Sequence, residues 1–127
     1  MSGPLYKVCT EAAFAEAVNK GHFEGSPDDR RDGFIHLSAR DQLRGTLDRH
    51  FAPQPGLVLL EVDTNRLGDG LKWEKSRGGA LFPHLYGPLD LAVVVSVMNL
   101  ELAEDGSHLL PDRRGGCVSG LFDMAQA

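Results

Sequence analysis

The spacing of apolar positions near the start of the chain predicts a strand followed by a helix. Residues 5–9 (LYKVC) place large apolar side chains at alternate positions, which is typical of a β-strand. In residues 11–20 the apolar side chains lie three and four positions apart, so they would share one face of a helix. Thr10 can cap this helix at its first turn, and Gly21 can end it.

A long polar stretch then separates this helix from a second strand. Residues 21–32 contain glycine, proline and many charges without any periodicity, and we interpret them as a loop long enough to be functional. Within it, Arg30 and Arg31 lie between aspartates, which is typical of a solvated loop that neutralises its own charge.

The next pattern predicts a second strand and a second helix. Residues 33–38 (GFIHLS) form a short apolar strand interrupted by His36. Ser38 and Asp41 have the spacing of a capping box, so a helix is expected to start at Ser38. That helix has to end before Pro53.

The second half of the chain is predicted to consist mainly of strands. Residues 57–62 are almost continuously apolar, which indicates a strand buried on both faces. A proline within a strand favours an edge position or a bulge, and we expect one of these for Pro83. Further strands are expected at 71–74, 81–86 and 91–100, and residues 101–127 form a hairpin or a tail. Strands alternating with two helices and followed by several strands indicate an α+β fold.

Length and charge limit the class of protein. The chain has 127 residues, of which 42% are hydrophobic, so we expect a single domain spanning residues 1–127. Lys and Arg total 13 against 18 Asp and Glu, and no basic run occurs. General nucleic-acid binding is therefore not expected, although a small phosphate-bearing ligand needs only one or two cations.

Cysteine usage and the N-terminus favour a soluble cytoplasmic protein. Cys9 and Cys117 lie near opposite ends of the chain and share no metal-binding spacing, so we interpret them as reduced thiols. The first residues do not resemble a signal peptide, and the longest apolar run, 91–95, is far below the ~20 residues of a membrane span. A monomer is expected, because no exposed periodic apolar stripe is predicted.

Three short stretches carry candidate chemistry. His36 and Ser38 are two positions apart, so they would share a strand face at the start of a helix, where backbone N–H groups can hold an anion. The same spacing fits a buried histidine and a capping serine. Trp73 and Glu74 place an aromatic ring beside a carboxylate, immediately before the flexible segment 76–79 (SRGG).

The third stretch, residues 82–89 (FPHLYGPL), places His84 and Tyr86 on one strand face between a proline and a Gly-Pro turn. Two polar aromatic side chains in such a position are unusual for a hydrophobic core. The other histidines are interpreted as structural or solvated: His22, His50 and His108.

Four segments together resemble a bacterial family known as domain of unknown function 952. They are residues 5–7 (LYK), 33–38 (GFIHLS), 72–74 (KWE) and 82–89 (FPHLYGPL), within a similarity that spans residues 5–100 and leaves 101–127 as an extension. The resemblance implies an ADP-ribosyltransferase-like fold, a split and strongly bent α+β sheet of mixed or antiparallel strands with two main helices. In that fold NAD binds in the cleft between the halves of the sheet.

Within that superfamily the motifs are most similar to those of the RNA 2'-phosphotransferases. Residues 36–38 (HLS) match the His-Leu-Ser strand of those enzymes, and residues 5–10 stand where their Leu-Tyr-His-Gly-Thr strand would lie. Lys7 replaces the histidine that would bind the adenosine ribose. The glutamate of many mono-ADP-ribosyltransferases has no identifiable counterpart here, which argues against ordinary protein ADP-ribosylation.

The resemblance implies an NAD-utilising or phosphotransferase-like enzyme with NAD or an ADP-ribose-type nucleotide as its ligand and with no metal. Its expected catalytic residues are His36, His84 and Glu74. Its expected ligand-binding residues are Lys7, Ser38, Trp73, Arg77 and Tyr86. In these roles His36 would bond a ribose hydroxyl or the diphosphate, Ser38 and the helix start at Ala39 would hold phosphate, and Lys7 or Arg77 would neutralise charge. His84 and Tyr86 would stand by the reacting ribose, and Glu74 would stabilise a cationic sugar or accept a proton.

These roles require a shared site. We therefore predict that His36, Trp73 or Glu74, and His84 or Tyr86 line a single pocket with Arg77 at its rim.

Two alternative hypotheses remain open from the sequence. In the first, the fold binds a nucleotide or small metabolite without catalysis, which the replacement at Lys7 favours. In the second, His36, His84 and Glu74 form the two-histidine, one-carboxylate ligand set of a metal enzyme.

Overall fold

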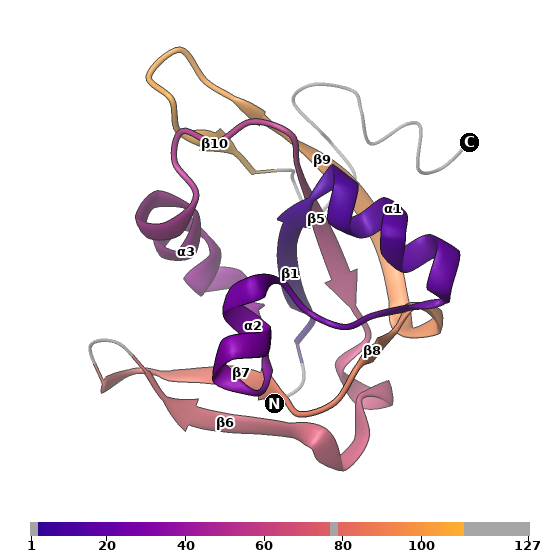
Figure 1. The fold of residues 1–127 in the computed structure, drawn as a ribbon. Helices are drawn as coiled ribbons and strands as arrows, with labels where there is room; N and C mark the ends of the chain where they lie inside the picture. Colours follow the sequence, from indigo (N-terminus) through magenta and orange to yellow (C-terminus); the bar gives the residue numbers. More distant parts are fainter. Residues whose placement is uncertain (1–2, 77–78, 111–127) are drawn as a thin grey trace.

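The centre of the main sheet is strand β5 (Leu57–Val62), whose residues are buried except for the half-buried Glu61. In this computed structural model, which describes residues 3–76 and 79–110, β5 pairs with antiparallel neighbours on both sides (Figure 1). The sheet order is β10-β9-β5-β1-β4, with β1 (Leu5–Thr10), β4 (Ser38–Ala39), β9 (Val94–Leu102) and β10 (His108–Leu109). The predicted burial of residues 57–62 is confirmed.

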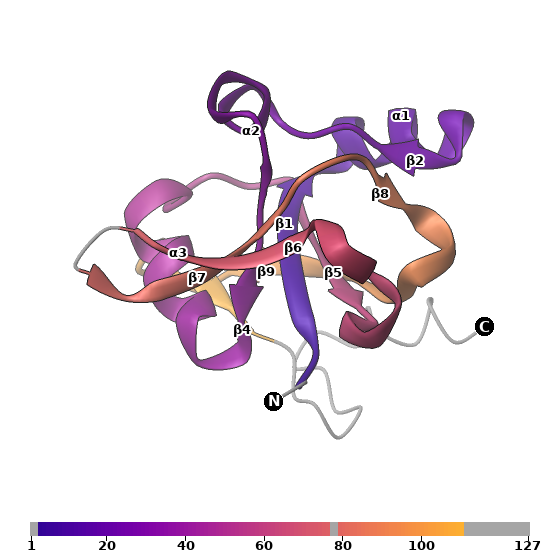
Figure 2. The same cartoon turned by 90° about the horizontal axis from the view of Figure 1, so that it is seen from below.

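A second, three-stranded sheet has the order β3-β7-β6 and also consists of antiparallel pairs. Its strands are β3 (Ile35–His36), β6 (Leu71–Lys75) and β7 (Leu81–Leu85), and a separate pair is formed by β2 (His22–Phe23) and β8 (Leu89–Asp90). Strands β6 and β7 run across the direction of β1 (Figure 2). The chain changes sheet at Leu37, because β3 ends one residue before it and β4 starts one residue after it. The α+β prediction is confirmed, with a curled antiparallel sheet and few helices.

The first predicted helix is confirmed as α1 (Glu11–Lys20). The Thr10 side chain accepts a hydrogen bond from the N–H of Ala13 at 3.0 Å, as expected of an N-cap. Gly21 ends the helix in the left-handed conformation, with φ of 87°.

The second predicted helix begins later than expected, and the predicted capping box at Ser38 is wrong. Ser38 lies in β4 paired with Tyr6, and its Oγ lies 3.0 Å from Thr46 Oγ1. A 3₁₀ turn follows at Arg40–Gln42, where the Gln42 side chain accepts a bond from the N–H of Ala39, and then α3 (Leu43–His50) starts. Sheet pairing has kept Ser38 extended, so its hydroxyl is not positioned over a helix start.

Helix α2 (Pro27–Asp32) occupies part of the segment interpreted as a loop, which corrects that interpretation. It starts with a capping box: the Ser26 N–H donates to Asp29 Oδ2, and the Asp29 N–H donates to Ser26 Oγ. The helix contains no apolar side chain besides proline, so hydrophobic periodicity could not reveal it. The sequence signal for this helix is the capping-box spacing of Ser26 and Asp29, which lie three positions apart.

Pro83 lies in the middle strand of its sheet, so the expected edge position or bulge is wrong. In a strand the N–H and C=O of one residue point to the same side. The Pro83 carbonyl accepts a bond from the N–H of Leu37, so the missing N–H also falls on the β3 side. The missing N–H does not face β6, so Pro83 leaves the β6–β7 pairing intact. On the other side β3 pairs only with His84 and Leu85, so Pro83 lies beyond the end of the β3–β7 pairing.

The predicted 91–100 strand starts only at Val94, after the short β8 and a 3₁₀ turn at Leu91–Val93. Further 3₁₀ turns occur at Thr64–Arg66 and Gly68–Gly70. Of the predicted C-terminal region 101–127, the described part forms a hairpin in which β10 pairs with the end of β9. Residues 111–127, Cys117 included, lie outside the described part of the chain.

Two hydrophobic clusters cover the two faces of the main sheet. Leu60 and Val62 point to the cluster shared with α1 and the second sheet, whereas Leu57 and Leu59 point to the cluster shared with α3. This division follows from the alternation of side chains along a strand. Within residues 3–76 and 79–110, no helix is long and apolar enough to cross a membrane.

We expect Leu60→Ala to lower the free energy of unfolding by about 3 kcal/mol, because Leu60 is fully buried and its removal leaves a cavity. Val95→Ala, at an exposed position of the neighbouring β9, should change it by less than about 0.5 kcal/mol. Chemical denaturation monitored by tryptophan fluorescence measures both. Equal effects of the two substitutions would contradict the central position of β5.

Candidate functional site

A cavity of about 250 Å³ opens between β1, α2, α3 and the second sheet. His36 and His84 both line it, from β3 and β7, which are paired at these two residues. Their ring centroids are 5.6 Å apart. Other lining residues come from β1 (Tyr6, Lys7, Val8), from α2 and its cap (Ser26, Asp28, Asp29, Arg31, Asp32) and from the α3 side (Ser38, Thr46, His50, Phe51). We call this cavity the cleft.

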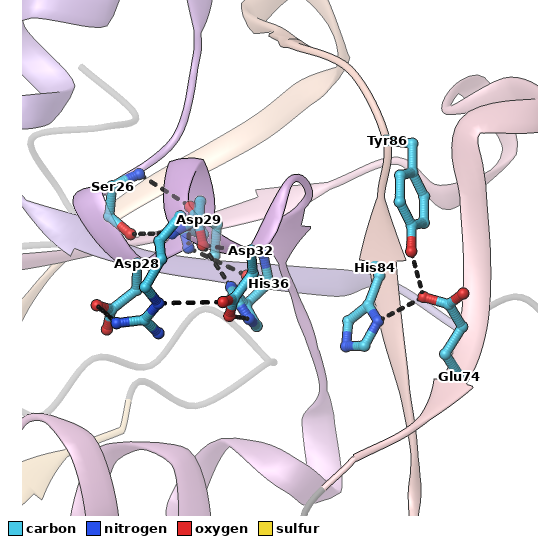
Figure 3. A network of polar contacts seen from close by, with 10 residues as sticks. Ser26, Asp28, Asp29, Asp32, His36, Glu74, His84 and Tyr86 are labelled. Atoms are coloured by element: carbon cyan, nitrogen blue, oxygen red, sulfur yellow. Dashed lines mark hydrogen bonds and ion pairs between the residues drawn. The ribbon is translucent and has the colours of Figure 1, made fainter.

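The buried carboxylate of Asp29 organises one wall of the cleft (Figure 3). Its Oδ1 accepts bonds from the backbone N–H of His36 at 3.1 Å and lies 2.6 Å from His36 Nδ1. Its Oδ2 accepts from the Ser26 N–H at 2.9 Å and lies 2.8 Å from Lys7 Nζ. All four acceptor positions of the carboxylate are thereby used.

These contacts determine the charge of Asp29. Burial by itself raises the pKa of the Asp29 carboxyl, but the bonds from His36, Lys7 and Ser26 outweigh it and hold the pKa well below its usual range. Asp29 is therefore a permanent buried anion at neutral pH.

Lys7 is the buried counter-ion of Asp29 and not an exposed ligand for phosphate. Its side chain is only 5% exposed, and Nζ also donates to the carbonyl of His36 at 3.1 Å. The expectation that Lys7 neutralises ligand charge is therefore revised, since its charge is already balanced within the protein.

His36 lies between two carboxylates from the same helix. Nδ1 faces Asp29, and Nε2 lies 3.0 Å from Asp32 Oδ2. Ionised carboxylates only accept hydrogen bonds, so both contacts are made together only when both ring nitrogens carry protons. Both ring nitrogens of His36 therefore face carboxylates on the wall of the cleft.

His84 is held differently, by a single carboxylate behind it. Nδ1 lies 2.8 Å from Glu74 Oε1, and the Tyr86 hydroxyl donates to the same oxygen at 2.8 Å. Figure 3 shows Nε2 of His84 on the side of the ring away from Glu74. The bonds from His84 and then Tyr86 lower the pKa of the Glu74 carboxyl, and the bond to Glu74 raises the pKa of Tyr86.

Phe34 packs against both imidazoles. Its ring stacks on His84 at a centroid distance of 4.0 Å and a 22° interplanar angle, and it lies 4.7 Å from His36. This contact limits rotation of His84, whose ring is also tied to Glu74.

The structure brings only some of the predicted site residues to the cleft wall. Ser38 lines it beside Thr46, whereas Glu74 and Tyr86 stand behind His84. Trp73 neighbours Glu74 in β6 and therefore points to the opposite face of the sheet, where it is exposed. Arg77 lies outside the described residues.

Sequence reasoning missed Asp29 and Asp32, which contact His36, and it interpreted His50 as structural or solvated although His50 lines the cleft. His22 pairs with Glu24 on the surface, and His108 is buried with Nε2 bonded to the carbonyl of Gln54, as the structural or solvated interpretation expected.

The described side chains contain no group of three or more His, Cys, Asp or Glu arranged to hold a metal ion. In particular, Nδ1 of His84 is bonded to Glu74, and both nitrogens of His36 face aspartates. The ligand set proposed by the metal hypothesis is therefore engaged in internal hydrogen bonds.

Comparison with known proteins places these observations in a family. The family model described as protein of unknown function (DUF952) matches residues 8–97. The chain is also similar to protein CC0527 from Caulobacter crescentus. It has 47% identity and a TM-score of 0.81 to the X-ray crystal structure, over 84% of this chain and 93% of that chain. The solution NMR structure of CC0527 gives 48% identity and a TM-score of 0.75, over 82% and 90%. The search of curated proteins found no match.

We expect Lys7→Met to lower the free energy of unfolding by about 3–5 kcal/mol, because it removes one partner of a buried ion pair. Lys72→Met, on the exposed part of β6, provides the control and should change it by less than about 0.5 kcal/mol. Denaturant unfolding measures both values. A loss below about 1 kcal/mol for Lys7→Met would show that the pair is not a stabilising contact.

Stability should also depend on the charge of Asp29. The folded-state pKa of Asp29 lies below the value of 3.8 expected of the unfolded chain, so its contribution is complete above about pH 5 and is lost as the pH falls. Below about pH 3.8, wild type should lose up to about 1.4 kcal/mol per pH unit more than Asp29→Asn, because the unfolded wild-type chain takes up one additional proton. Unfolding measured from pH 7 to pH 2 tests this, and parallel profiles would contradict it.

Proposed function

The chain belongs to the DUF952 family, and we propose that its cleft binds a nucleotide of the ADP-ribose class and supports transfer or cleavage at a ribose. The observation that carries the proposal is the pairing of two histidines with different hydrogen-bond partners on one cleft wall. His36 lies between two aspartates, and His84 is oriented by Glu74.

The position of the cleft supports the choice of ligand. It lies where the strands divide into two sheets, at the change of sheet between β3 and β4. This matches the place of the ligand in the ADP-ribosyltransferase-like fold that the sequence motifs resemble. The volume of about 250 Å³ is below the roughly 300–1,000 Å³ of pockets that enclose drug-sized ligands. A nucleoside half would therefore fill the cleft, and the remainder of a dinucleotide would extend along the surface.

The contact with Glu74 gives His84 the properties of a general base. Because the Glu74 carboxylate accepts a hydrogen bond from Nδ1–H, the neutral form of His84 carries its lone pair on Nε2. In ribosyl transfer, the bond from the ribose C1' to the nicotinamide nitrogen breaks and its electron pair goes to the pyridinium ring. The acceptor oxygen bonds to C1', and its proton moves to Nε2 of His84.

His36 contributes charge to the same site. In its protonated form His36, whose ring lies 5.6 Å from that of His84, donates a hydrogen bond to a ribose hydroxyl or a phosphate oxygen and does not accept a proton. The two rings therefore divide binding and proton transfer between them.

A second candidate function is binding of a nucleotide or small metabolite without turnover. The observation that favours it is the buried pair of Lys7 and Asp29, because Lys7 stands where the related motif has a ribose-binding histidine. In this case the cleft would keep its ligand but lack one contact that positions the ribose for reaction.

The first experiment measures binding by isothermal titration calorimetry with NAD, ADP-ribose and a 2'-phosphorylated RNA end. Release of nicotinamide from NAD is followed in parallel. We expect binding of at least one ligand, and in the enzyme case His84→Ala should lower nicotinamide release by at least about 100-fold. His22→Ala is the control, since His22 pairs with Glu24 outside the cleft and should leave release unchanged.

The outcomes separate the candidates. Binding that weakens in His36→Ala, without turnover in wild type, supports the binding module. No binding of any of the three ligands at millimolar concentration overturns the proposed function. Glu74→Gln adds a second test of the enzyme case, because it should lower turnover and change its pH profile while ligand affinity stays within about threefold.

A further inference from the structure

The last residue of α2, Asp32, places its carboxylate between the side chains of His36 and Arg31 at the cleft. Asp32 Oδ2 lies 3.0 Å from His36 Nε2, and Asp32 Oδ1 accepts a bond from Arg31 Nε at 3.1 Å. All three residues line the cleft. The Asp32 carboxylate therefore lies between His36 Nε2 and Arg31 Nε.

This carboxylate differs from that of Asp29 in burial. Asp29 is 2% exposed with all its acceptor positions used, whereas Asp32 is 34% exposed and Arg31 is 68% exposed. Ion pairs this open to solvent contribute about 0–1 kcal/mol, so Asp32 can exchange its partners at little cost to the fold. Asp29 cannot, because its removal would leave Lys7 buried without its counter-ion.

Helix α2 itself is suited to such an exchange. Apart from Pro27, which is exposed, its side chains are all charged, and only Asp29 is buried. The capping box of Ser26 and Asp29 holds its first turn, and the N–H groups of Gly33 and Phe34 donate to the carbonyl of Asp29 at its end. Asp32 reaches His36 from the last turn, so a change in the side-chain conformation of Asp32 opens no hydrophobic contact.

We propose that His36 Nε2 and Arg31 Nε form an anion subsite that Asp32 fills in this structure and that a phosphate group of the ligand takes over. The inference rests on the proposed function and deepens it, since it assigns a subsite to one phosphate of an ADP-ribose-class nucleotide. A phosphate presents the same oxygen acceptors to the two donors as the carboxylate does. Asp32 then competes with the ligand and lowers its affinity.

The test compares Asp32→Asn with Asp28→Asn. Asp28 is the matched control, because it lies on the same helix, lines the same cleft, bonds Arg31 Nη1 and changes the net charge equally, yet has no contact with His36. Affinities for ADP-ribose and for inorganic pyrophosphate are measured by calorimetry. The His36 imidazole resonances are followed by NMR during both titrations.

We expect Asp32→Asn to raise the affinity for these anions about five- to tenfold and Asp28→Asn to change it by less than twofold. Adding Arg31→Gln to Asp32→Asn should remove the gain, because one of the two donors is then lost. Thermal unfolding checks that each variant is folded. If Asp32→Asn unfolds the protein, Asp32→Glu is used in its place, and the rate of carbethoxylation of His36 is measured in place of the affinity. A rate equal to that of wild type would count against the subsite.

The results distinguish this inference from the proposed function. Pyrophosphate that shifts the His36 resonances of Asp32→Asn, without any binding of ADP-ribose, supports the anion subsite and contradicts the nucleotide ligand. Unchanged or weaker affinity in Asp32→Asn, or equal gains in Asp32→Asn and Asp28→Asn, would overturn the subsite. Binding of ADP-ribose without a shift of the His36 resonances would overturn it as well, while leaving the nucleotide proposal in place.

Discussion

The arrangement of the cleft depends on one buried carboxylate, that of Asp29. Removing an ionised carboxylate from water costs several kcal/mol, and the cost is offset here by four hydrogen bonds or ion-pair contacts. Those contacts come from β1 through Lys7, from β3 through His36 and from the start of α2 through Ser26. Because the buried charge needs all of them together, it fixes the positions of these three elements relative to one another.

The same requirement explains why two neighbouring histidines differ. His36 faces the α2 carboxylates of Asp29 and Asp32 with both ring nitrogens. His84 is one strand away and meets Glu74 with only one nitrogen, because β6 supplies a single carboxylate on that face. The pairing of β3 with β7 then brings the two rings within 5.6 Å. A histidine held by two carboxylates and a histidine held by one thereby lie side by side.

The parts of the fold that depend on local patterns could be predicted from the sequence. The strand at 57–62 and the helix at 11–20 have apolar periodicity and caps of their own, and both occur as expected. Helix α2 lacks apolar residues, so its position is determined by Asp29, a contact with β1 and β3 that no local pattern reveals. Ser38 had a local capping signal, but pairing with Tyr6 in the sheet overrides it.

For the site, the spacing of His84 and Tyr86 indicated a shared face, and both side chains do meet at Glu74. Lys7 could be recognised as unusual in an apolar strand, but its partner lies 22 residues later in a segment without periodicity. The difference between Asp29 and Asp32 was still harder to predict from the sequence, because the two residues have the same chemistry and lie in the same helix. Burial and partners separate them: Asp29 is 2% exposed and pairs with the buried Lys7, whereas Asp32 is 34% exposed and pairs with the exposed Arg31. One six-residue helix can therefore fix the orientation of His36 through Asp29 and also supply, in Asp32, a carboxylate at His36 Nε2 that a ligand can replace.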